Sequence, residues 1–204
     1  MYKTDVPIIA QHALASADGL HDVIHFVVAT INMPLSRVIE QRLAFATFGY
    51  DSKWLSKQKK DTLLYAETHK VSLYDGVCRV LDKHDSPSLD AAHKSVLHFM
   101  QLPGIGAVKA GFISQMCGIN VACIDRHNVA ILNIDENVVK IPKTLQPDLL
   151  NRKVRDYAKL CRRKGAEYWW DTWCAYVADR GGMNKTLATA EAVSRYHVDA
   201  ILNY

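Results

Sequence analysis

The stretch Leu102-Pro103-Gly104-Ile105-Gly106-Ala107-Val108-Lys109-Ala110 indicates the fold more strongly than any other part of this chain. A proline followed by two glycines one residue apart lets the backbone turn sharply, because no Cβ atom stands in the way. Apolar residues recur at helical spacing on both sides of the turn. Leu102 and Ile105 are the side chains that would hold the turn against a core. We therefore expect a tight hairpin between two helices.

The start of the second hairpin helix predicts an anion-binding site. The backbone amides of Gly104, Gly106 and Ala107 should point outward at its first turn. Amides at a helix N-terminus have no partner within the helix, and the helix dipole adds a partial positive charge. A DNA phosphate is a suitable ligand for such a site. A purely structural turn is the alternative interpretation.

Asp125 lies in Ile124-Asp125-Arg126-His127-Asn128, about twenty residues after the glycines. A short apolar segment ends there and a helix is expected to begin, so the carboxylate can cap that helix. The same carboxylate can face a nucleotide that has been flipped out of a duplex. It would then orient a water molecule or stabilise positive charge that develops on the sugar. The two roles are compatible, and we expect both.

Size and composition are those of an ordinary globular protein. The chain has 204 residues, which suits one domain or two small lobes that share a core. Hydrophobic residues make up 49% and charged residues 23%. No apolar run approaches the roughly 18 residues of a membrane helix, and residues 1–7 lack the apolar core of a signal peptide. We therefore expect a cytoplasmic protein with no membrane partner.

Basic residues are unevenly distributed along the chain, whose net charge is +4. Residues 140–165 contain nine Lys or Arg and two Asp: Lys140, Lys143, Arg152, Lys153, Arg155, Lys159, Arg162, Arg163 and Lys164 against Asp148 and Asp156. A second cluster around Trp54 contains Lys53, Lys57, Lys59 and Lys60. Such patches suit phosphate contacts. A solvated helix face is the alternative interpretation of each.

Cysteines and histidines do not predict a metal site. The five cysteines are irregularly spaced without a CxxC pair, so buried free thiols are expected. His21 and His25 are spaced to share a helix face, but Asp22 stands where the HExxH motif has glutamate and no third ligand follows. We expect exposed or core-edge histidines, no metal and no cofactor.

Apolar spacing predicts an almost entirely helical chain. Eight expected helices have both ends predicted: residues 21–29, 35–48, 57–69, 72–84, 107–117, 148–164, 166–179 and 189–202. Pro34 is expected in the first turn of the second of these. Two further helices are expected from their starts alone, one opened by residues 86–88 and one starting at residue 126. Residues 119–124 are expected to be an extended linker, and residues 180–182 to break a helix. Trp169, Trp173 and Tyr176 share one helical stripe, for which core packing is favoured over base stacking.

Residues 102–132 resemble the hairpin and catalytic aspartate of the helix-hairpin-helix DNA glycosylases, the relatives of endonuclease III, adenine-mismatch glycosylase and 3-methyladenine glycosylase. A weaker similarity extends back to about His21 and includes Asn32, in a loop similar to the one that fills the gap left by an extruded base. The resemblance implies an all-α fold of two lobes with a cleft between them. One lobe would be a six-helix barrel of residues 22–134, and the other would combine residues 1–21 with 135–204.

The same resemblance implies base flipping by a monomer on double-stranded DNA. Asp125 would be the catalytic residue, and in a base-modifying branch of the superfamily His127, two residues away, would assist it. The residues that it implies for DNA binding are Asn32, Gly104, Ile105, Gly106, Ala107, Lys109 and Arg126. Some relatives hold an iron–sulfur cluster on four close C-terminal cysteines, and only Cys161 and Cys174 lie in that region here.

One departure from the family concerns the lysine nucleophile of its bifunctional members. That lysine stands two positions after the second hairpin glycine, where this chain has Val108. Lys109 is one residue later, about 100° around the helix. Because valine cannot form an imine, we expect a monofunctional N-glycosylase that uses water, with Lys109 as an exposed phosphate contact. A nucleophilic Lys109 is the alternative.

Two further functions stay open. Residues 108–112, 123–128 and 171–176 resemble a phage-encoded branch of this superfamily. That branch implies a transferase that attaches an amino acid to a thymine in place instead of excising the base. The last interpretation is a non-catalytic hairpin module that only holds DNA, in which Asp125 has no role beyond capping its helix.

Overall fold

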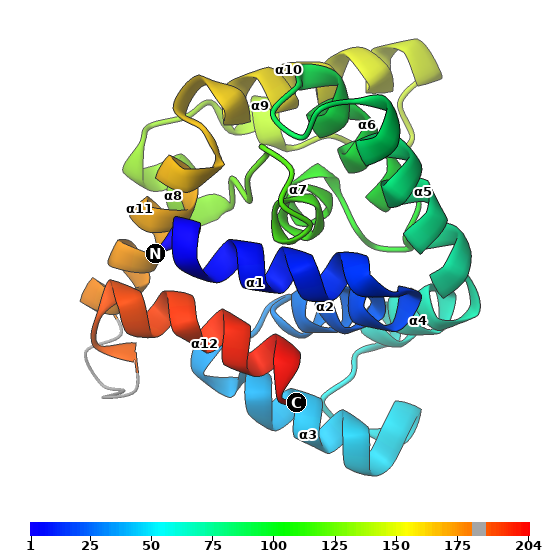
Figure 1. Cartoon of the computed structure of the whole chain (residues 1–204), viewed down its shortest axis with the longest axis vertical. Helices are drawn as coiled ribbons and strands as arrows, with labels where there is room; N and C mark the ends of the chain where they lie inside the picture. Colours follow the sequence, from blue (N-terminus) through cyan, green and yellow to red (C-terminus); the bar gives the residue numbers. More distant parts are fainter. Residues whose placement is uncertain (181–186) are drawn as a thin grey trace.

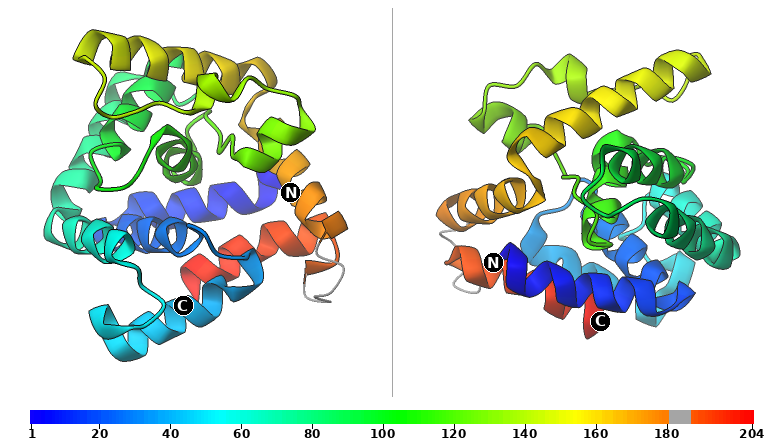
Figure 2. Two further views of the ribbon diagram at one scale, coloured as in Figure 1. Left: turned by 180° about the vertical axis from the view of Figure 1, so that it is seen from behind. Right: turned by 45° about the horizontal axis from the view of Figure 1, so that its top comes forward.

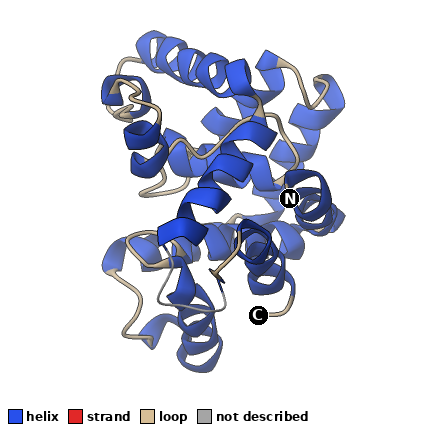
Figure 3. Ribbon diagram, turned by 90° about the vertical axis from the view of Figure 1, so that its left-hand side faces the viewer, coloured by secondary structure: helices blue, strands red, loops and turns tan. Residues whose placement is uncertain are grey.

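The computed structural model describes residues 1–180 and 187–204, and within these ranges all regular structure is helical (Figure 3). The predicted all-α class is confirmed. The elements are α1 (Tyr2–Ala15), α2 (Ala17–Ala29), η1 (Leu35–Arg37), α3 (Val38–Phe48), η2 (Gly49–Asp51), α4 (Lys57–Thr68), α5 (Lys70–Lys83), α6 (Leu89–Phe99), α7 (Ala107–Met116), α8 (Arg126–Ile131), α9 (Glu136–Val139), α10 (Pro147–Lys164), α11 (Ala166–Arg180) and α12 (Ala190–Leu202), where η1 and η2 are 3₁₀ turns.

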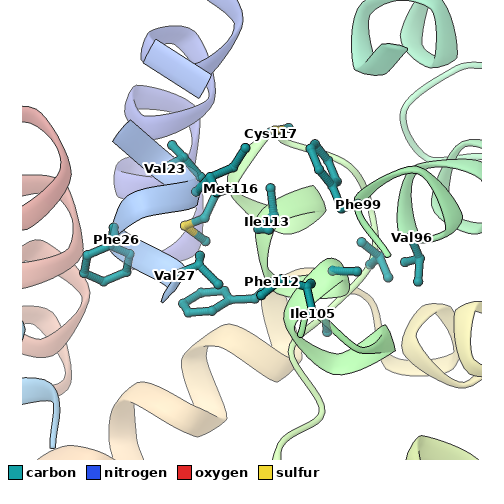
Figure 4. Packing of buried hydrophobic residues seen from close by; sticks show 14 of the residues in the cluster. Val23, Phe26, Val27, Val96, Phe99, Ile105, Phe112, Ile113, Met116 and Cys117 are labelled. Atoms are coloured by element: carbon teal, nitrogen blue, oxygen red, sulfur yellow. The ribbon is translucent and has the colours of Figure 1, made fainter. Parts of the chain in front are cut away.

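Helix α7, the second hairpin helix, lies at the centre of the molecule. Figure 1 shows it end-on, with α1 and α2 below it and α5 and α6 to its right. Its side chains are buried almost all round, as expected for a helix that is apolar on every face. Figure 4 shows Ile113 and Met116 of α7 between Val27 of α2 and Phe99 of α6. The core therefore fixes the helix whose first turn forms the hairpin.

The extended segment 119–124 lies close against α7. A Cβ atom on Gly111 would come within 2.6 Å of the Ala122 carbonyl oxygen and 2.9 Å of the Tyr157 hydroxyl. Only glycine fits at this approach, because both neighbours are buried and held in place. The segment leads directly to Asp125, so its contact with α7 sets where that carboxylate stands.

The first and last helices of the chain lie side by side. Helix α12 packs along α1, and both contact α11 (Figures 1 and 2). A buried network joins the three helices: Ser194 Oγ donates to the Asp5 carboxylate at 2.6 Å and accepts from Trp170 Nε1 at 2.9 Å. Residues from α11 and α12 are thereby held next to α7 and α2.

The predicted division into two lobes can be compared with the helix bounds. The boundary between residues 21 and 22 lies inside α2, and the boundary between residues 134 and 135 lies between α8 and α9. Helix α1 packs on both α2 and α7. The two lobes themselves stay a prediction.

Most expected helices form, with shifted ends. Helix α2 starts four residues earlier than expected, because Ser16 Oγ accepts from the Gly19 amide as a cap. Pro34 precedes the 3₁₀ turn η1 and is not inside a helix. Helices α1 and α9 were not expected at all. The predicted break at residues 180–182 falls largely outside the described residues.

No helix in the described ranges is long and apolar enough to cross a membrane.

Candidate functional site

The hairpin forms as predicted, but its two glycines differ. Gly104 has φ +72°, a left-handed conformation that favours glycine, whereas Gly106 has φ −91° and open space where a Cβ would be. Leu102 and Ile105 are fully buried, so they hold the turn against the core as expected.

The carbonyl groups of residues 102–104 all accept hydrogen bonds from side chains. Lys143 Nζ donates to the Leu102 carbonyl at 2.6 Å. Thr62 Oγ1 donates to the Pro103 carbonyl at 2.7 Å, and Gln58 Nε2 donates to the Gly104 carbonyl at 3.0 Å. These bonds come from α4 and from the segment before α10, so the turn is fixed from two sides.

The backbone amides at the start of α7, unlike the carbonyl groups of the turn, are unpaired within the described part of the chain. Those of Gly106, Ala107, Val108 and Lys109 have no acceptor among the described residues, and no side chain caps α7. Unpaired amides at the start of a ten-residue helix attract an anion. The hairpin thus has the chemistry predicted for a phosphate site.

A cavity of about 1000 Å³ opens beside this turn. Its wall comes from residues 30–35 after α2, four residues of α7, residues from 123–129, α9 with Lys140, α11 and His197 of α12. The four residues of α7 are Val108, Lys109, Phe112 and Gln115. Five predicted site residues lie together in this wall: Asn32, Lys109, Asp125, Arg126 and His127. The other four, Gly104, Ile105, Gly106 and Ala107, form the adjoining turn and do not line the cavity.

Asp125 caps α8 as predicted and is held by three N–H groups. Its Oδ1 accepts from the amides of His127 at 3.0 Å and Asn128 at 3.1 Å. Its Oδ2 accepts from Trp173 Nε1 at 3.1 Å. The side chain is half-buried in the cavity wall. The carboxylate is therefore held in one orientation at the edge of a space that can admit a ligand.

Lys109 is not the exposed side chain that the sequence led us to expect. It is half-buried in the cavity wall, and its Nζ donates to Thr30 Oγ1 at 3.0 Å and lies 5.4 Å from the centre of the Phe112 ring. Thr30 in turn donates to the Val27 carbonyl at 2.6 Å. Val108 lines the same cavity. The amine thus shares the cavity with Asp125.

The remaining predicted residues lie nearer the cavity mouth. Arg126 is exposed, and His127 is half-buried with its ring 5.1 Å from that of Tyr176. Asn32 is exposed and has φ +53°, which is uncommon for a residue other than glycine. It belongs to the segment 30–35, which follows α2 and lines the cavity.

Sequence analysis missed three residues of this wall: Trp173, Gln115 and His197. Trp173 was assigned to core packing, but it is half-buried and bonded to Asp125. Gln115 and His197 are buried in the wall. No local pattern identifies them, because each meets the cavity only through the packing of α7, α11 and α12. Trp169 and Trp170, also in the wall, are buried as the core-packing interpretation predicts.

The basic clusters are only partly available for phosphate. Lys59 is buried and donates to the Ala29 carbonyl and to Gln41, so neither interpretation of its cluster, phosphate contact or solvated helix face, holds for this residue. Burial, and then the nearby Lys109 charge, lower the pKa of Lys59 to about 8. Trp54 is half-buried, with the Arg37 guanidinium 4.6 Å from its ring centre.

In the segment 140–165, several cations have partners within the protein. Arg155 pairs with Asp90 at 2.9 Å and Lys159 with Asp156 at 3.1 Å. Five exposed cations of α10 form no ion pair with any described residue: Arg152, Lys153, Arg162, Arg163 and Lys164. The free basic surface is therefore smaller than the composition indicated.

Among the described residues, no group of three metal-ligating side chains comes together. His25 is buried and its ring packs 4.4 Å from Phe45, while His21 lies 3.3 Å from Glu67. The five cysteines are free thiols. Burial raises the pKa of Cys123, which lines the cavity, to about 12, so this thiol is protonated at neutral pH.

No family model matches this sequence, no curated protein is significantly similar to it, and no solved structure significantly resembles it. What the chain does must therefore be inferred from the hairpin and the cavity themselves.

Proposed function

We propose that this chain is a DNA base enzyme that cleaves an N-glycosidic bond, with Asp125 as its essential carboxylate. One observation carries the proposal. The first turn of α7 supplies both the unpaired amides of residues 106–109 and two residues of the cavity wall, Val108 and Lys109. A phosphate bound at these amides would adjoin the cavity, so the nucleotide attached to it would need to travel only a short distance to reach Asp125.

The proposal includes a fold and a partner. The fold is the two-lobed arrangement of the helix-hairpin-helix DNA glycosylases, and the partner is double-stranded DNA bound by a monomer. Exposed Arg126 in the cavity wall is suited to a flanking phosphate, whereas Lys140 is paired with Glu136. Asn32, exposed in the same wall, would occupy the gap that the everted nucleotide leaves in the duplex.

In the proposed reaction the bond between the base nitrogen and the sugar C1′ breaks. The base leaves with the bonding electrons and takes up a proton, and a water molecule adds to C1′ and loses one. Asp125 stabilises the positive charge that grows on the sugar and orients the water. The amides of His127 and Asn128 and the indole of Trp173 hold this carboxylate ready, so it does not need to reorganise during the reaction.

The test is excision from duplex oligonucleotides that carry damaged or modified bases, with the products identified by mass spectrometry. Asp125→Asn keeps an oxygen that can cap α8 but loses the charge. We expect excision to fall at least about 100-fold while DNA binding stays within about twofold. Asp135→Asn is the matched control, because Asp135 caps α9 through the Asn137 amide but does not line the cavity. Equal excision by Asp125→Asn contradicts the proposal.

The mass spectra also separate the other functions. A free base indicates a glycosylase, whereas a heavier nucleoside indicates transfer of a group to the base in place. Binding with no chemistry on any substrate indicates a holding module. DNA affinity should fall as salt rises, because phosphate contacts release counterions. Affinity that does not change with salt contradicts every one of these functions.

Lys109 supports a second candidate, a glycosylase that also forms an imine with the sugar. The specific observation is that its amine lies inside the cavity, held by Thr30. In this reaction the neutral amine attacks C1′ as the base leaves with the bonding electrons and takes up one amine proton. The C1′–O4′ bond of the resulting aminal then breaks as the second amine proton passes to O4′, and the imine so formed can be reduced by borohydride to a stable protein–DNA link. Trapping by the wild type and none by Lys109→Gln supports this candidate. Full excision without trapping leaves the water mechanism.

A further inference from the structure

A second hollow, of about 310 Å³, lies between α5 and α6. It shares no lining residue with the cavity beside the hairpin, and Figure 1 shows α5 to the right of α7, with α8 and α11 to the left of α7. Its lining includes three cations, two histidines and a glycine: Arg79, Lys83, Lys94, His84, His98 and Gly76. No carboxylate of a described residue lines it, so the hollow is positively charged.

The three cations of this hollow have no counter-charge in the described part of the chain. All three are exposed, and none forms an ion pair or a side-chain hydrogen bond with a described residue. A carboxylate four residues away on a helix commonly pairs with a cation. Here Asp90, four residues before Lys94, pairs instead with Arg155 of α10 at 2.9 Å. Asp75, four residues before Arg79, neither pairs with it nor lines the hollow.

The helix dipole accounts for only one of these cations. Lys83 lies in the last turn of α5, where a positive charge is favourable. Arg79 lies one turn earlier and Lys94 lies in the middle of α6, so neither of them stands at a helix end. Like charges that gather at one place repel one another, and a bound anion removes that repulsion.

The concave shape of the hollow comes from the packing of α5 on α6. The ring of His98 lies against Gly76, where an added Cβ atom would come within 2.6 Å of His98 Nε2, so this position requires glycine. His98 Nε2 lies 2.8 Å from the Leu73 carbonyl oxygen, which can only accept, so Nε2 carries the proton. Its Nδ1 lies 3.2 Å from Gln101 Nε2 and accepts from it. The ring is therefore neutral and fixed by bonds on both nitrogens.

The charge of His98 is further disfavoured by its surroundings. Burial, and to a smaller extent the nearby Arg79 charge, lower the pKa of His98, whereas its bond to the Leu73 carbonyl raises it. The hollow thus combines a fixed, neutral ring with exposed cations from two helices.

The number of cations indicates the kind of anion. A phosphodiester in a nucleic-acid strand has one negative charge. A phosphate monoester has a charge of about −2 at pH 7 and three terminal oxygens that accept hydrogen bonds. Two cations from α5 and one from α6 can each donate to a different one of these oxygens. The monoester is therefore the better match.

We propose that the hollow between α5 and α6 binds the phosphate group of a phosphate monoester through Arg79, Lys83 and Lys94. Two sources carry such a group, a free small molecule and the phosphorylated end of a nucleic-acid strand. The inference goes beyond the proposed function, because it adds an anion site that uses neither the hairpin amides nor Asp125.

The test compares methyl phosphate, a monoester, with dimethyl phosphate, a diester, by titration calorimetry at constant ionic strength. We expect methyl phosphate to bind at least about fivefold more tightly. Lys94→Gln and Arg79→Gln keep a long polar side chain without the charge, and each should weaken methyl phosphate binding at least about fivefold. Lys153→Gln is the matched control, because Lys153 is an exposed cation of α10 that forms no ion pair with a described residue and does not line the hollow. It should leave the binding unchanged.

Duplex oligonucleotides distinguish the two sources of the phosphate. A duplex with 5′-terminal phosphates is compared with the same duplex without them. A gain in affinity that Lys94→Gln removes assigns the site to the end of a DNA strand. Methyl phosphate binding that Lys94→Gln removes, with no gain from the terminal phosphates, assigns the site to a free monoester.

The hairpin is a second anion site under the proposed function, and one variant separates the two. Methyl phosphate binding that is lost in Gly106→Ala and kept in Lys94→Gln belongs to the hairpin and overturns the inference. So does equal binding of the two esters, unchanged binding by both Lys94→Gln and Arg79→Gln, or no saturable binding of methyl phosphate up to about 50 mM. Weaker binding of an unphosphorylated duplex by Lys94→Gln assigns the hollow to the strand backbone and also overturns it. Methyl phosphate binding in the hollow of a chain that excises nothing refutes only the proposed function.

Discussion

Gly104 and Gly106 stand two positions apart in the hairpin, yet only Gly104 needs to be glycine for the fold. The φ of Gly104 is +72°, and a Cβ atom there would lie 2.6 Å from Gln58 Nε2. We expect Gly104→Ala to lower the free energy of unfolding by about 1–2 kcal/mol, as measured by urea denaturation. Gly106→Ala should change it by less than about 0.5 kcal/mol, because φ is −91° and the space is open.

The same pair of variants tests the phosphate site. The Cβ of Gly106→Ala would enter the open space beside an unpaired amide, where a bound phosphate would meet it, so DNA binding should weaken while stability does not change. Binding can be measured by fluorescence anisotropy at fixed salt. A Gly106→Ala chain that binds DNA as well as the wild type would show that these amides do not hold a phosphate.

At the residue scale, the sequence predicted what depends on local geometry. Asp125 could be placed as a cap because the cap bonds reach only the two amides of His127 and Asn128. Its third bond, from Trp173, joins residues 48 positions apart, and no spacing pattern reports such a contact. The burial of Lys109 was missed for the same reason, because Thr30, its partner, lies 79 positions away.

At the scale of elements, α11 is the support for the start of α8. Trp173 donates to Asp125, and Tyr176, one turn further along, packs its ring 5.1 Å from that of His127. Both contacts come from one face of α11. Helix α8 has only six residues, so it depends on this neighbour and on its cap for its position.

Trp173→Phe should therefore reduce the rate of excision more than it reduces substrate binding. The variant keeps a ring against His197 but removes the N–H that holds Asp125 Oδ2. We expect kcat to fall about 10- to 100-fold with KM changed less than about threefold, because a bond to a charged group is lost. Trp54→Phe, whose ring lies outside the cavity, should retain the wild-type kcat. Equal losses in both variants would argue for a general effect on folding.

Helices were predictable where apolar residues recur with a strong helical period, as in α2, α6 and α10. Helix α1 could not be predicted from local sequence, because its buried apolar residues, such as Val6 and Ile9, lie on a helix that packs against α12 and α2, which are distant or separate elements. The four-residue α9 is too short to show any periodicity.

At the scale of the whole molecule, two buried histidines make stability depend on pH. Burial lowers the pKa of His25 from 6.5 to about 3 and that of His197 to about 4. The unfolded chain therefore takes up protons first as the pH falls below 6.5. The free energy of unfolding therefore has its full contribution from these two neutral histidines above pH 6.5. This contribution is lost progressively as the pH falls toward 4.

At pH 5 each histidine should lower the free energy of unfolding by about 2 kcal/mol relative to pH 7. Urea denaturation at the two pH values measures this difference. The double variant with His25→Phe and His197→Phe should show a difference smaller by about 4 kcal/mol. A pH dependence that is the same in this variant and the wild type would contradict the assignment.

The way the hairpin is tied into the molecule has a consequence for nucleic-acid selectivity. The carbonyl oxygens of residues 102–104 each accept from a side chain of the protein, Lys143, Thr62 and Gln58, whereas the amides of residues 106–109 have no acceptor among the described residues. Such amides would bind the phosphodiester of either sugar alike, because the phosphate oxygens of DNA and RNA are the same. Discrimination between deoxyribose and ribose must then be made by the pocket that receives the nucleoside, not by the grip on the strand.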